Sequence, residues 1–161
     1  METYAIVGEL VLLSSALDHC LTEVIIEVLD LGSSYMLLPT LGTIDSVRKI
    51  EILKERAHHI AQVEWKNRVM SFIKKVESVF KHRNIACHTP AVLENGQWTL
   101  KPYTVAKVLK KIDLQQKKIK SISFNDLQDA IHTAESALGA GRNLIDNFKR
   151  LNVAKAEKAK K

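Results

Sequence analysis

The stretch AIVGELVLLSSALDHCLTEVIIEVLDLG, residues 5–32, decides the fold, because it is long and mainly apolar. Its polar residues fall on one side of a helix and are Ser15, Asp18, His19, Thr22, Glu23 and Glu27. We therefore expect a helix of roughly 25 residues. Its apolar surface is wider than one core contact needs, so we expect it to be central to a helical bundle and also to form a subunit interface.

The composition favours one compact domain that spans residues 1–152. A chain of 161 residues with 46% hydrophobic content can build a substantial core. The net charge of +6 suggests an anionic partner, although ordinary soluble proteins also carry such an excess. The cysteines, Cys20 and Cys87, lack C-x-x-C spacing and fit a reducing, cytoplasmic setting. Glu9 and Asp18 interrupt the first apolar run, so we expect neither a signal peptide nor a membrane span.

Two more helices are expected in the first half of the chain. A second helix should run from about residue 43 to residue 60 and carry charged, solvated residues on its outer face. Before it lies a connecting loop whose apolar residues should pack against the protein, namely Tyr35, Met36, Leu37 and Leu38. A third helix should begin near Val63 and end at or just before His88, because Thr89-Pro90 disfavours helix.

The second half of the chain contains a turn, a basic stretch and a capped helix. Asn95-Gly96 predicts a small β-hairpin within residues 91–103. The basic stretch that follows could track an RNA backbone and contains Lys101, Lys107, Lys110, Lys111, Lys117 and Lys118; a merely solvated surface is an equally good interpretation. Ser123 and Asp126 form an S-x-x-D capping box that starts the last helix. The basic tail, residues 153–161, has little to bury and is expected to be disordered.

The end of the third helix raises the question of function. Its apolar residues recur at intervals of three or four positions, at Trp65, Val69, Phe72, Val76 and Val79. The next two positions at this spacing are Arg83 and Cys87. Arg83 and His88 then lie about 140° apart on the helix, with Asn84 and Cys87 between them. An arginine on a buried stripe needs an anionic partner, which is either a carboxylate, such as that of Asp18 or Glu23, or a ligand.

These features resemble the HEPN superfamily. The resemblance rests on the long apolar first helix, the sequence RNIACH at the end of the third helix and the capped final helix, and it extends over residues 5–150. The family signature is R-x(4 to 6)-H, usually with a polar residue directly after the arginine, and these positions are Arg83, Asn84 and His88. The resemblance implies an all-α bundle of four to five helices. It also implies a metal-independent endoribonuclease in which two subunits bring their motifs together at a two-fold axis.

Each motif residue suits that chemistry. Histidine titrates near neutral pH, so His88 could remove the ribose 2′-hydroxyl proton or protonate the leaving 5′-oxygen. The fork of donors of Arg83 matches phosphate oxygens as negative charge builds in the transition state. Asn84 would orient the phosphate or the histidine. An acidic residue of the first helix often faces the motif arginine in this superfamily, and here Asp18 is expected to do so.

The resemblance also sets the expected partners and the alternatives. RNA, a second copy of the chain and an antitoxin or other partner protein are expected, in a toxin or defence setting, with no cofactor and no metal. No tyrosine follows His88 by two positions, so modification of such a tyrosine by a nucleotidyltransferase antitoxin is not expected. The main alternative is a non-catalytic module that binds RNA, a nucleotide or a protein. Another is a structural dimer in which Arg83 forms a salt bridge.

Overall fold

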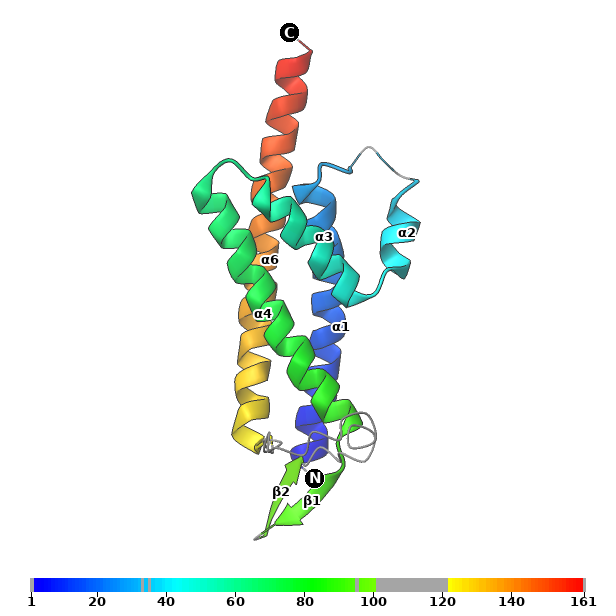
Figure 1. The fold of residues 1–161 in the computed structure, drawn as a ribbon, viewed down its shortest axis with the longest axis vertical. Coiled ribbons are helices and arrows are strands. Elements are labelled where there is room, and N and C mark those ends of the chain that lie inside the picture. The colour runs from blue at the N-terminus through cyan, green and yellow to red at the C-terminus, as the bar shows by residue number, and fades with distance from the viewer. Residues whose placement is uncertain (1, 33, 35, 95, 101–121, 161) are drawn as a thin grey trace, which may run out of the picture.

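The computed structural model describes residues 2–32, 34, 36–94, 96–100 and 122–160, and it shows an all-α bundle with a small hairpin (Figure 1). The elements are α1 (Glu2–Val28), α2 (Leu38–Thr43), α3 (Ser46–His58), α4 (Val63–His88), β1 (Ala91–Glu94), β2 (Gln97–Leu100) and α6 (Phe124–Ala159). The predicted all-α fold is confirmed. Within these ranges, no helix is long and apolar enough to cross a membrane.

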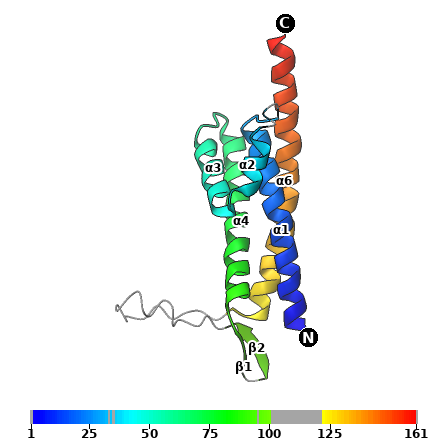
Figure 2. The ribbon, with the colours of Figure 1, turned by 90° about the vertical axis from the view of Figure 1, so that its right-hand side faces the viewer.

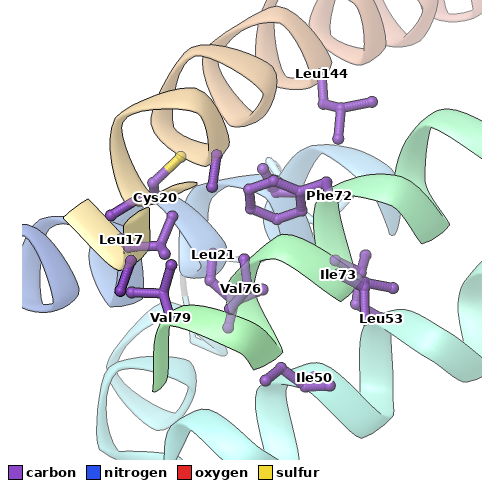
Figure 3. Close-up of a cluster of buried hydrophobic side chains, with 14 of the residues drawn as sticks. Leu17, Cys20, Leu21, Ile50, Leu53, Phe72, Ile73, Val76, Val79 and Leu144 are labelled. Carbon is purple, nitrogen blue, oxygen red and sulfur yellow. The ribbon is translucent and has the colours of Figure 1, made fainter. Parts of the chain in front are cut away.

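The long helices α1, α4 and α6 run along the length of the molecule, and α3 packs beside α1 and α4 (Figures 1 and 2). α1 contacts α3, α4 and α6, so its predicted central position is confirmed. Leucine, isoleucine, valine and phenylalanine side chains from all these helices form the core (Figure 3). At its centre, Leu21 of α1, Leu53 of α3 and Phe72 of α4 are fully buried.

Local sequence signals explain where the helices begin and end. The carboxylate of Asp45 accepts a hydrogen bond from the Arg48 backbone N–H at 2.9 Å and caps α3, so the second predicted helix begins later than expected. α4 ends at His88, directly before Thr89-Pro90, as predicted. The predicted capping box at Ser123 and Asp126 is present at the start of α6.

The predicted hairpin is confirmed over residues 91–94 and 96–100, and residues 95 and 101–103 of the predicted range lie outside the described residues. β1 and β2 pair antiparallel, with Ala91 opposite Leu100 and Glu94 opposite Gln97. Gly96 in the turn has a φ of 77°, a conformation that glycine adopts without steric cost. A bridge between Leu100 and Ile122, both buried, attaches the hairpin beside the start of α6.

Two expectations about surface segments differ from the structure. Met36 is 90% exposed and Leu37 is exposed, so the expectation that these two residues pack was wrong. Leu38 is half-buried, and Tyr35 lies outside the described residues. The short helix α2 instead buries Leu41. At the other end of the chain, α6 continues as a helix to Ala159 through most of the tail that was expected to be disordered.

The glycines of α6 provide a matched pair for a stability measurement. A Cβ atom on Gly141 would lie 3.0 Å from Phe72 Cε2 and would also overlap Cys20 Sγ, whereas a Cβ on Gly139 would meet nothing within 4 Å. Another element therefore approaches the helix backbone closely at Gly141 but not at Gly139. We expect Gly141→Ala to lower the free energy of unfolding by about 1–3 kcal/mol through overpacking.

Gly139→Ala is the control for that measurement. This substitution should raise the free energy of unfolding by up to about 1 kcal/mol, because alanine is the better helix former and the added methyl group meets open space. Urea unfolding of the two variants measures both changes. Equal effects of the two substitutions would contradict the packing of α6 against α1 and α4 at Gly141.

Candidate functional site

Arg83, Asn84 and His88 lie together on the last two turns of α4, and all three are exposed. The Arg83 guanidinium donates a hydrogen bond from Nη1 to Oδ1 of Asn84 at 2.9 Å. His88 follows Asn84 by one helical turn, so the two side chains leave the same face of the helix. The motif therefore presents a polar face to solvent.

The expectation that Arg83 and Cys87 continue the buried stripe was wrong. Both are exposed, and after Val79 the next buried residue of α4 is Ala86. The reason is the length of the neighbouring helix: α3 has 13 residues and α4 has 26, so α3 covers only part of α4 (Figure 2). In the part of α4 near His88, the buried side is the side that faces α1 and α6. Arg83 does not lie on that side and is exposed.

The Asp18 carboxylate has partners other than Arg83. Its Oδ2 accepts from Lys49 Nζ at 2.7 Å, and its Oδ1 accepts from the Ser46 hydroxyl at 2.6 Å. Lys49 is only 2% exposed, and a buried ammonium requires a counter-ion. The expected pairing of Asp18 with Arg83 was therefore wrong.

Sequence reasoning missed Lys49, because we placed the charged residues of this helix on its solvated face. The signal was present: Lys49 precedes Leu53 by four residues, and such a pair shares one face of a helix. Leu53 is fully buried, and Lys49 lies beside it on the same side.

Arg83 and Asn84 line a groove of about 720 Å³ between α1, α3 and α4. Asp18 and Ser46 form part of its wall, and Phe80 contributes an apolar side chain. The structure thus brings Arg83, Asn84 and Asp18 to one groove, whereas His88 is not among the residues that line it.

The acids of this groove are mostly neutralised by neighbouring cations. Glu77 pairs with Lys54 at 2.6 Å, and Glu51 pairs with Arg48 at 2.8 Å, in addition to the Asp18 pair. Within the described part of the chain, the guanidinium of Arg83 makes no ion pair with any acid. This rules out a salt bridge from Arg83 to a buried acid of these residues and leaves its positive charge available to an anion.

The thiols have different environments. Cys20 is buried, and its burial, together with the nearby Glu23 carboxylate, raises the pKa of the thiol, so Cys20 is poorly suited to act as a nucleophile. Cys87 is exposed beside His88, contrary to the expectation that it packs into the core.

Some predicted contacts lie outside the described residues. These are the lysines of the basic stretch, Lys101, Lys107, Lys110, Lys111, Lys117 and Lys118. Of the residues that are described, no group of three or more histidine, cysteine, aspartate or glutamate side chains is placed to hold a metal ion.

Comparison with known proteins gives no family assignment. None of the protein-family models, curated proteins or solved structures with which the chain was compared matches it.

Proposed function

We propose that the protein is a metal-independent endoribonuclease that uses Arg83, Asn84 and His88, together with the same residues of a second copy of the chain. The observation that carries this proposal is the exposed guanidinium of Arg83, which no acid of the described residues neutralises. It lies beside Asn84, and His88 follows Asn84 by one helical turn. A charged fork of donors at an open surface suits the planar, bidentate recognition of a phosphate group.

The proposed reaction needs one proton acceptor and one proton donor. His88 removes the proton of the ribose 2′-hydroxyl, and the 2′-oxygen attacks the neighbouring phosphorus. The bond to the 5′-oxygen breaks, and this oxygen receives a proton from His88 of the partner subunit. Arg83 donates to the phosphate oxygens as their negative charge increases. The products are a 2′,3′-cyclic phosphate and a free 5′-hydroxyl.

The need for two histidines is the reason for proposing a homodimer. α1 offers exposed apolar residues for an interface, with Tyr4 at 72% and Leu12 at 73% exposure. Light scattering should therefore give a mass of twice 18.1 kDa at micromolar concentration. A chain that is monomeric at the concentration at which it cuts RNA would contradict the shared site.

The chemistry of the product ends tests the proposed reaction. The protein is incubated with structured RNA in excess EDTA, and the new 3′ ends are examined by mass spectrometry. We expect cleavage under these conditions with 2′,3′-cyclic phosphate ends, because the 2′-oxygen is the nucleophile. Cleavage that requires Mg²⁺, or that leaves 5′-phosphate ends, would contradict the proposal.

A further inference from the structure

The last part of α6 forms a basic arm, which we define as residues 149–160. It projects beyond the other helices at the end of the molecule that is opposite the hairpin (Figures 1 and 2). Its cations are Lys149, Arg150, Lys155, Lys158 and Lys160, and its one acid is Glu157. Every one of these side chains is exposed, and none forms an ion pair with a described residue.

The arm is anchored only at its base. Asn152 donates a hydrogen bond from Nδ2 to the backbone carbonyl of Glu27 at 2.8 Å, near the end of α1. Residues 153–160 are exposed throughout. Alanine, lysine and glutamate, which favour helix, make up residues 154–160, so the sequence supports a straight continuation of α6 without packing.

The distribution of charge on the arm indicates its kind of partner. With 100° per residue, Lys149 and Lys160 point in nearly the same direction, whereas Lys155 and Lys158 point to other sides. The large apolar residues, Leu151 and Val153, lie about 160° apart and form no stripe. A helix that lies on a membrane or docks on a partner helix needs one continuous apolar face. Cations on all sides instead suit the phosphates of a nucleic acid.

The position of the arm indicates the size of that nucleic acid. α4 ends near the start of α6, so the motif and the arm lie at opposite ends of the molecule (Figure 1). The centre of the arm follows Phe124 by about 30 residues, which corresponds to roughly 45 Å of helix. For a strand of stacked nucleotides with phosphates about every 3.4 Å, roughly 13 nucleotides separate the two places.

We propose that the basic arm binds the backbone of a long RNA at a distance from the residues that cut it. This inference rests on the proposed function for the nature of the ligand, and it adds a second contact on the same chain. Short RNAs would reach the motif alone, whereas RNAs of more than about 13 nucleotides would also reach the arm.

The test measures binding in the absence of cleavage, in a His88→Ala background. The probes are fluorescein-labelled single-stranded RNAs of about 6 and about 30 nucleotides, and fluorescence anisotropy is recorded over a range of salt concentrations. The arm variant carries Lys155→Gln, Lys158→Gln and Lys160→Gln. A matched control carries Lys66→Gln, Lys74→Gln and Arg142→Gln. It loses the same number of charges from α4 and from the packed part of α6, at positions that form no ion pair with a described residue.

We expect the arm variant to bind the longer RNA roughly 10- to 100-fold more weakly at about 0.1 M salt. The slope of log K against log salt concentration should become shallower by about 2, which is the value for three lost phosphate contacts on a single strand. Binding of the short RNA should not change. The affinity of the control variant for the longer RNA should stay close to that of the protein with the unsubstituted arm.

Other results would overturn the inference. Equal losses in the two variants would show that only net charge matters, and weaker binding of the short RNA would place the arm at the motif. If the arm variant lost binding to phosphatidylserine vesicles but bound RNA as before, the arm would be a membrane contact. Failure of the nuclease proposal is recognised separately. If the wild type never cuts RNA but the arm variant binds the longer RNA more weakly as expected, the protein has an RNA-binding arm without nuclease activity.

Discussion

Replacing Arg83 with alanine is expected to lower the rate of RNA cleavage by about 10²- to 10³-fold. The free energy of unfolding should change by no more than about 0.5 kcal/mol, because the side chain is exposed and its hydrogen bond is to the neighbouring Asn84. Single-turnover cleavage of a defined RNA and urea unfolding of the same preparation measure the two quantities.

Two further variants separate charge, geometry and stability at this position. Arg83→Lys keeps the positive charge but loses the fork of donors, so its rate should lie between those of the wild type and Arg83→Ala. Lys74→Ala removes an exposed cation from the same helix and should leave the rate unchanged. If Arg83→Ala instead destabilised the protein by more than about 2 kcal/mol, Arg83 would have a structural role that its exposed position does not predict.

The second large effect concerns the ion pair between Asp18 and Lys49. Asp18→Ala should lower the free energy of unfolding by about 3 kcal/mol, because it leaves the ammonium group of Lys49 buried without a counter-ion. The Ser46 hydroxyl also loses its acceptor. For a chain of this size the melting temperature should fall by about 6–12 °C, which differential scanning calorimetry would detect.

Lys49→Met is the control for this effect. It removes the buried charge and fills a similar volume, whereas the carboxylate of Asp18 is 35% exposed and keeps its hydrogen bond from Ser46. The loss of stability should therefore be much smaller than in Asp18→Ala, and it is expected to be near zero. An equal loss in both variants would show that the interaction, and not the uncompensated ammonium, accounts for the stability.

Features set by local sequence were predictable. The end of α4 at His88 follows from the restriction that Pro90 places on Thr89, and the start of α6 follows from the capping box at Ser123. The hairpin follows from Asn95-Gly96. Each of these signals acts within a few residues of the feature that it determines, so no knowledge of the packing was needed.

Features set by neighbouring helices were not predictable. The spacing from Val76 and Val79 to Arg83 is correct for a stripe, but it does not tell where α3 ceases to cover α4. For Lys49 the spacing from Leu53 indicates the buried face of the helix, but it does not show that Asp18 lies opposite; the apolar stem and charged end of a lysine fit either a surface or a buried ion pair. The partner of Asp18 followed from the placement of α3 against α1, which is a tertiary contact.

The most direct test of the central claim is a side-by-side cleavage assay of the wild type and a folded His88→Ala variant in excess EDTA. We predict that the wild type cuts RNA and that the variant is slower by about 10²- to 10⁴-fold, because His88 supplies the proton transfers. Circular dichroism should show the same helical content in both, since His88 is exposed at the end of α4. Equal rates for the two proteins, or RNA binding by both without cleavage by either, would contradict the nuclease account and favour a binding module.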